Sequence, residues 1–234
     1  MADRRIVAAI VLPLLLAGCG AFGPTFAPTG ACLVDGRAPG AYPDLEARIP
    51  RTINGRPATS VDSGRNCSTD ALGSLANHGV REIRFAGATW DESNGNGVSI
   101  AILALPDRDL PVAWAEEFYL LGAEGGKHTG NIETSRPTYA GAGPVFRLDT
   151  LNDLSFQTVV LWSDGGLVRV VIVATQVGPN ASRSVHDARV AEAVGAAVLA
   201  EEAGPGPGGS PLASPLGGGG AGGPSPGPVL PSPS

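Results

Sequence analysis

Two adjacent apolar runs near the C-terminal end constrain the fold more than any other feature of the chain. Residues 154–163 and 167–177 are strand-like runs, and Asp164-Gly165-Gly166 between them is a turn sequence. This arrangement predicts a β-hairpin. Residues 167–174 are apolar on both faces of the expected strand, which is typical of a strand in the interior of a sheet. The chain must therefore supply neighbouring strands on either side of it.

The rest of the chain alternates strand-like and helix-like patterns. Strands are expected at residues 49–57, with a turn at Asn54-Gly55, at 81–90 and 98–105 around a polar hairpin loop, and more weakly within 131–149. Helices are expected from Ser68 to about Asn77, from Pro111 to Gly122, and from Ser184 to about Glu202, where Asp187 completes a capping-box-like start. We therefore predict an α+β fold: a mainly antiparallel sheet of six or seven strands with about three packed helices, flanked by disordered ends.

The first 18 residues have the pattern of an export signal. Arginines at the start precede an apolar run from Ile6 to Leu16, and the run is too short to span a bilayer and is interrupted by Pro13. At Leu16-Ala17-Gly18-Cys19 the sequence resembles the lipobox of bacterial lipoproteins. The resemblance implies cleavage before Cys19, with diacylglycerol (acyl chains such as palmitate) on its thiol. Two acyl chains suffice for stable attachment to the extracytoplasmic face of a cell membrane. The alternative is an ordinary secreted protein with a chance cysteine.

The lipobox also bears on the other two cysteines, because lipidation of Cys19 leaves Cys32 and Cys67 as an even pair. Outside the cytosol such a pair most simply forms a disulfide, which would pin the N-terminal segment against the first helix. Free buried thiols and a metal site are the alternatives, although two cysteines without matching histidines make a poor metal site.

The chain is expected to contain one folded domain between two unstructured segments. Residues 19–31 form the lipidated cysteine and a linker, and residues 32–203 form a single domain. Residues 204–234 hold 11 glycines and 9 prolines in 31 residues, with no charged or aromatic side chain. This composition predicts a disordered tail, since it offers too little apolar surface to offset the entropy of ordering. A partner-binding tail of polyproline character is the alternative.

No sequence motif identifies a catalytic, cofactor or metal site. His78, His128 and His186 lie far apart without ligand-spaced neighbours and are expected at the surface. The oxygen-rich segment Asp91–Gly97 is expected to be a polar turn and not a calcium loop, because no glutamate stands at the twelfth position. Tyr119 is the aromatic residue whose exposure would indicate a binding platform. A net charge of −6 without clustered lysines or arginines argues against nucleic acid as a partner.

Two further resemblances concern the domain. The element order is loosely similar to the PsbP-like fold. With Asp44-Leu-Glu-Ala-Arg-Ile-Pro50, Ile53-Asn-Gly-Arg-Pro57 and Ser60-Val-Asp-Ser-Gly64, the region 44–105 resembles a set of uncharacterised exported bacterial proteins. Neither resemblance implies a mechanism. We therefore expect an extracytoplasmic lipoprotein whose domain is non-catalytic, partnered by the membrane through its lipid and by an unknown envelope protein or small ligand. A cell-envelope hydrolase with an unrecognised active site and an accessory subunit of a membrane complex are the alternatives.

Overall fold

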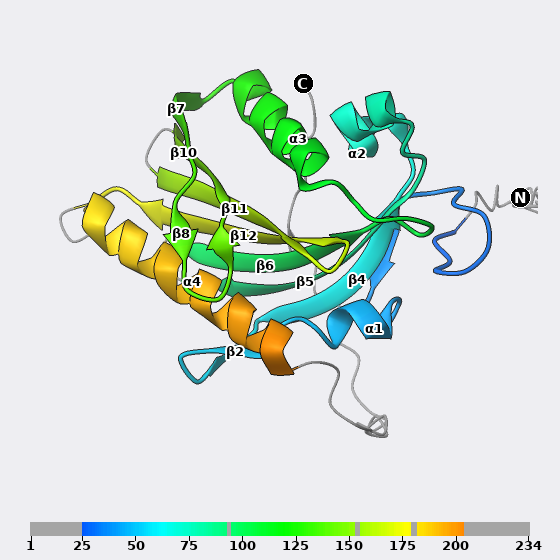
Figure 1. The fold of residues 1–234 in the computed structure, drawn as a ribbon, viewed down its shortest axis with the longest axis horizontal. Helices are drawn as coiled ribbons and strands as arrows, with labels where there is room; N and C mark the ends of the chain where they lie inside the picture. The colour runs from blue at the N-terminus through cyan, green and yellow to red at the C-terminus, as the bar shows by residue number, and fades with distance from the viewer. Residues whose placement is uncertain (1–24, 93–94, 153–154, 179–181, 204–234) are drawn as a thin grey trace, which may run out of the picture.

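The computed structural model describes residues 25–92, 95–152, 155–178 and 182–203, and for residues 201–203 only the backbone. The predicted signal segment 1–18, Cys19 and the tail 204–234 lie outside these ranges. Within them, the main feature is one antiparallel sheet of eight strands in the order β1-β4-β5-β6-β12-β11-β10-β7 (Figure 1). Its strands are β1 (Gly36–Ala38), β4 (Ser60–Asn66), β5 (Ile83–Asp91), β6 (Gly97–Ala104), β7 (Thr129–Ser135), β10 (Phe146–Asn152), β11 (Ser155–Asp164) and β12 (Leu167–Gln176).

Two small hairpins and a few helices complete the described part of the chain. The hairpins pair β2 (Thr52–Ile53) with β3 (Arg56–Pro57), and β8 (Thr138–Tyr139) with β9 (Gly143–Pro144). The helices are α1 (Pro43–Glu46), α2 (Thr69–Leu72), the 3-10 helix η1 (Gly73–His78), α3 (Val112–Gly125) and α4 (Arg183–Ala203). The α+β class is confirmed, and the main sheet has one strand more than the largest number expected.

The position of β12 agrees with its sequence. It pairs with β6 on one side and β11 on the other, so it lies inside the sheet as predicted. Alternate residues of the strand enter different cores: Val168 and Val170 face the core under α3, whereas Val171 and Val173 face the core under α4. A strand covered on both faces can be apolar throughout.

Helices cover the two faces of the sheet separately (Figure 1). Helix α3 and the α2–η1 segment pack on one face through residues such as Leu75, Ala115 and Phe118. Helix α4 crosses the other face. Its buried apolar side consists of Val190, Ala193, Val194, Ala197 and Val198. The result is a three-layer arrangement in which the C-terminal end of α4 lies beside the β2–β3 hairpin.

Several element boundaries differ from those expected. Ser68 caps α2 by accepting a hydrogen bond from the Ala71 amide at 3.2 Å, as predicted, but the helix changes to a 3-10 turn at Gly73. Helix α3 continues through Gly122 to Gly125 because the glycine tolerates helical dihedrals. At the start of α4 the cap is Ser182, whose hydroxyl accepts from the Val185 amide at 3.4 Å; the predicted cap, Ser184, lies inside the helix.

Strand β4 was missed because its sequence lacks the usual strand pattern. It is polar and contains Gly64 in its interior, a residue that weakens isolated strands. The glycine is required by packing: a Cβ at Gly64 would lie 2.7 Å from the Cβ of Arg37 on β1. β4 therefore forms because β1 and β5 pair with it on both sides.

The N-terminal segment is fastened to the end of β4. Cys32 and Cys67 form the predicted disulfide, with 5.9 Å between their Cα atoms. The Asp35 carboxylate accepts hydrogen bonds from the Cys67 amide at 2.6 Å and the Ser68 amide at 2.8 Å. Residues 28–31 belong to the segment expected to be linker, yet they contact the domain. The Pro28 carbonyl oxygen accepts from the Tyr42 hydroxyl at 3.0 Å, and Arg65 binds the two residues at the end of the segment.

Arg65, a buried arginine of β4, binds the backbone of the N-terminal segment. Its guanidinium donates to the carbonyl oxygens of Gly30 and Ala31, both at 2.9 Å. Together with the disulfide, these bonds extend the domain to at least residue 30.

None of the described helices combines the length and the apolar character needed to cross a membrane.

Candidate functional site

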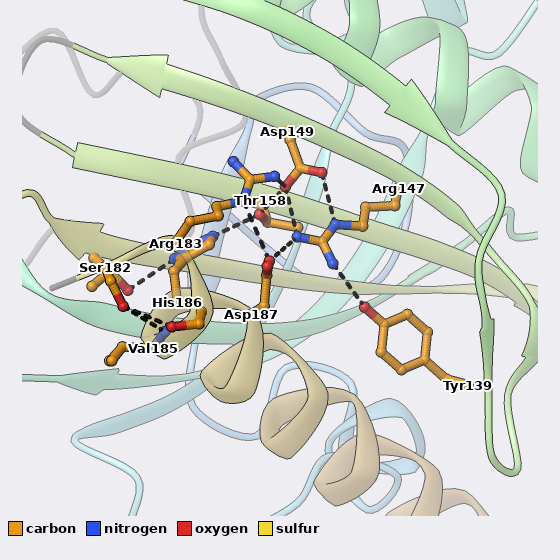
Figure 2. A network of polar contacts seen from close by, with 11 residues as sticks. Tyr139, Arg147, Asp149, Thr158, Ser182, Arg183, Val185, His186 and Asp187 are labelled. Carbon is orange, nitrogen blue, oxygen red and sulfur yellow. Dashed lines mark hydrogen bonds and ion pairs between the residues drawn. The ribbon is translucent and has the colours of Figure 1, made fainter.

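A polar network lies where the first turn of α4 meets β10 and β11, and it is the densest group of charged side chains in the described residues (Figure 2). Arg147 and Asp149 stand two residues apart on β10, so their side chains share a face of the sheet. The Arg147 Nε donates to Asp149 Oδ2 at 2.7 Å, and its Nη2 donates to Asp187 Oδ1 at 2.5 Å. Arg183 adds a second cation 3.0 Å from Asp149. The helix start is thus ion-paired to the sheet.

The charges of the network stabilise one another. Burial alone would raise the pKa of the Asp149 carboxyl, but hydrogen bonds from Arg147 and Thr158, with the nearby charge of Arg183, hold that pKa below its usual range. Burial opposes a charge on Arg147, yet its bonds to Asp149 and Asp187 raise its pKa. These groups remain ionised at neutral pH.

His186 forms the inner end of the network, and the prediction that it lies at the surface is wrong. Its side chain is 0% exposed, with Nε2 2.7 Å from Thr158 Oγ1 and Nδ1 2.9 Å from Thr175 Oγ1. Histidine is amphipathic enough to be buried when both ring nitrogens are bonded, and the sequence alone gives no sign of the two threonines on neighbouring strands.

The acceptors in the network fix its proton positions. The Asp149 carboxylate can only accept, so the Thr158 hydroxyl donates to it. The Thr158 oxygen then accepts from Nε2–H of His186, which leaves Nδ1 to accept from the Thr175 hydroxyl. His186 is therefore the neutral Nε2–H tautomer. Burial, followed by the charge of Arg183, lowers its pKa to about 4.

An aspartate, a histidine and a threonine in contact are the residue types of a nucleophilic catalytic site, but this geometry does not serve that chemistry. Thr158 and His186 are both fully buried, so no substrate reaches the hydroxyl. The threonine proton points to Asp149 and not to a histidine nitrogen that could accept it. The network fastens α4 to the sheet.

A groove at the other end of α4 offers an accessible surface. Its volume is about 610 Å³, and it runs between the C-terminal half of α4 and the segment that contains β2. It is lined by Ala47, Ile49, Pro50, Arg51, Thr52 and Asn54 on one side and by Ala191, Glu192, Gly195, Ala196, Leu199 and Ala200 on the other. Leu199 is 66% exposed there. The groove is thus a largely apolar hollow bordered by Arg51 and Glu192.

Gly195 gives the groove its depth. A Cβ at this position would meet nothing within 4 Å, so the glycine is not needed for packing inside the domain. A glycine in a helix interior costs about 1 kcal/mol relative to alanine. This destabilising glycine lies at a position where the missing side chain leaves open space in the groove.

The other predicted positions have structural roles. His78 lies 2.7 Å from Glu117 and stacks on Trp114 with 4.6 Å between ring centroids, while His128 is exposed as expected. Tyr119 is buried, and burial raises its pKa, so it offers no exposed platform. In the segment Asp91–Gly97, of which residues 93–94 are not described, Glu92 pairs with two arginines and Asn96 binds a backbone amide, as suits a turn.

The described residues contain no group of three or more histidine, cysteine, aspartate or glutamate side chains placed to hold a metal ion. A scan against protein-family models and a search of curated proteins found no match to the chain. The functional interpretation therefore depends on the groove, the network and the N-terminal sequence.

Proposed function

We propose that this protein is a lipoprotein anchored through Cys19 to the extracytoplasmic face of a cell membrane, and that its domain is a non-catalytic binding module. The groove between α4 and residues 47–54 is the proposed binding site. The observation that supports this function is the coincidence of a hollow of about 610 Å³ with the exposed side chain of Leu199. Apolar hollows of this size are typical of ligand and peptide sites.

The remaining chemistry of the domain favours binding over catalysis. The histidine and threonine of the polar network are inaccessible, and the border of the groove carries one cation, Arg51, and one carboxylate, Glu192. A single carboxylate without a partner acid or base is a poor hydrolytic centre. The disulfide Cys32–Cys67 agrees with an oxidising compartment.

The anchor is tested by a Cys19→Ala variant. We expect the wild-type protein to partition into the membrane fraction and to incorporate an alkyne-labelled fatty acid, and the variant to lose both properties. A Cys32→Ser/Cys67→Ser variant is the matched control, because it also replaces cysteines but keeps the lipobox. Retention of the Cys19→Ala variant in the membrane fraction would show that the anchoring proposal is wrong.

The groove is tested in intact cells by photocrosslinking. p-Benzoylphenylalanine in place of Leu199 should give discrete adducts upon irradiation. The same probe in place of Leu121, which is 47% exposed on α3 across the sheet, should give few. Equal adduct patterns from the two positions would contradict a binding site in the groove. An adduct with one membrane protein in stoichiometric amounts would identify the chain as a subunit of a membrane complex.

A further inference from the structure

The groove lies next to the point where the uncharged C-terminal segment leaves the domain. Ala200 lines the groove, α4 ends at Ala203, and 31 residues follow. The first six of them, residues 204–209, read Gly-Pro-Gly-Pro-Gly-Gly, and the next seven, residues 210–216, read Ser-Pro-Leu-Ala-Ser-Pro-Leu. A glycine-rich stretch thus separates the helix end from a short segment that repeats Ser-Pro-Leu.

We propose that residues 210–216 of the same chain dock in this groove and cover it until a ligand displaces them. The inference rests on the proposed function, because it names the resting occupant of the same binding site.

The lengths of the two partners match. The α4 side of the groove runs from Ala191 to Ala200, roughly 14 Å at 1.5 Å per residue. Seven residues in a polyproline conformation cover roughly 20 Å at 3.1 Å per residue. Residues 204–209 reach up to about 20 Å when extended, enough to reverse the chain so that residues 210–216 run back along α4.

The chemistry of the two partners also matches. The groove is lined mainly by alanine, isoleucine, proline and leucine side chains, and Leu199 in its lining is largely exposed. Residues 210–216 carry Leu212 and Leu216, two prolines and no charge, so docking would bury no ion. The open space at Gly195 can receive one of the leucines.

Because residues 210–216 are covalently attached to the domain, even a weak contact is sufficient for them to occupy the groove. A short flexible tether gives an effective concentration on the order of millimolar, so a segment whose free peptide binds with a millimolar Kd still occupies the groove for a large share of the time. A separate ligand of higher affinity can then compete with it. The tail would act as a weak, built-in competitor.

The test uses the purified mature protein with p-benzoylphenylalanine in place of Leu212, and in a matched protein in place of Leu230. Both positions are leucines of the segment 204–234, and a urea-unfolding midpoint equal to that of wild type verifies that each probe leaves the domain folded. We expect the probe at Leu212 to crosslink within the monomer to residues 47–54 or 191–200. The yield from Leu230 should be lower by about tenfold, because its tether is longer and its neighbours differ.

Equal yields from the two probes, or no crosslink to either wall of the groove, would overturn the proposal. Crosslinked dimers in place of monomers would identify a second copy of the chain as the occupant. A protein truncated after Ala203 separates this proposal from the proposed function: its Leu199 probe should give more adducts in cells than the full chain does. If the adducts are unchanged, the groove binds a ligand but the tail does not cover it. If they are absent from both proteins, the binding module itself is refuted.

Discussion

Acidification should destabilise the domain through His186. Burial lowers the pKa of this histidine to about 4, whereas an unfolded chain has a histidine pKa of about 6.5. The unfolded state therefore binds more protons between these two values, and stability falls as the pH falls from about 6.5 towards 4. Above pH 6.5 both states are neutral and the contribution is fully present.

The size of the effect follows from the difference between the two pKa values. A shift of about 2.5 units corresponds to roughly 3 kcal/mol at 1.36 kcal/mol per unit, of which roughly 2 kcal/mol is lost by pH 5. Burial of the charged imidazolium is the largest cost of protonation; repulsion from Arg183 adds to this cost, while Asp187 and Asp149 offset part of it. Because His186 is 0% exposed, the charged ring would lose its hydration by water.

The assay is urea unfolding of the disulfide-bonded protein at pH 7.5 and pH 5, with wild type, His186→Gln and His128→Gln compared. Glutamine retains a donor and an acceptor but does not titrate, so His186→Gln should be less stable at pH 7.5 and should lose most of the fall in stability at pH 5. The exposed His128 is the control, and its variant should keep the wild-type difference in stability between pH 7.5 and pH 5. If His186→Gln shows the full wild-type fall, the argument that this buried neutral histidine controls acid stability is wrong.

Three variants test other parts of the fold by urea unfolding. Replacing Cys32 and Cys67 by serine should lower the free energy of unfolding by about 3–4 kcal/mol, as the chain-entropy model predicts for a loop of 35 residues; an unchanged value would mean that the bridge does not constrain the unfolded chain. Gly64→Ala should cost about 1–3 kcal/mol, because the new Cβ would press on β1. Gly195→Ala is the contrasting change: it should raise stability by about 0.5–1 kcal/mol, since helix propensity improves and no atom lies within 4 Å. A loss of stability in this variant would show that Gly195 has a packing role.

The sequence predicts the parts of the fold that are governed by local pattern. The hairpin of β11 and β12 is recognisable from its two strand-like runs around the Asp164-Gly165-Gly166 turn, and the helices α3 and α4 are recognisable from their start signals. β4 is not recognisable, because its pairing partners and not its own residues determine its conformation. β1, with three residues, is too short to produce a pattern.

The candidate sites depend on contacts between residues distant in sequence. Arg147 and Asp149 on alternate positions of one strand could have indicated an ion pair. Asp187, which also pairs with Arg147, is 40 residues away in the sequence. The groove is less predictable still, since its two walls come from residues 47–54 and 191–200. In the sequence, Ala191, Gly195, Ala196 and Ala200 of α4 have the pattern of an ordinary helix surface. Only the structure shows that they line a groove.

The disulfide has a mechanical consequence for a protein tethered by its N-terminus. Tension from a lipid on Cys19 would reach Cys32 and pass through the covalent bond to Cys67, bypassing every residue between them. The bypassed loop, residues 33–66, contains one entire wall of the groove. Along the covalent chain, a pull from the membrane would therefore pass from Cys32 to Cys67 and on to β5 without extending the backbone of that wall.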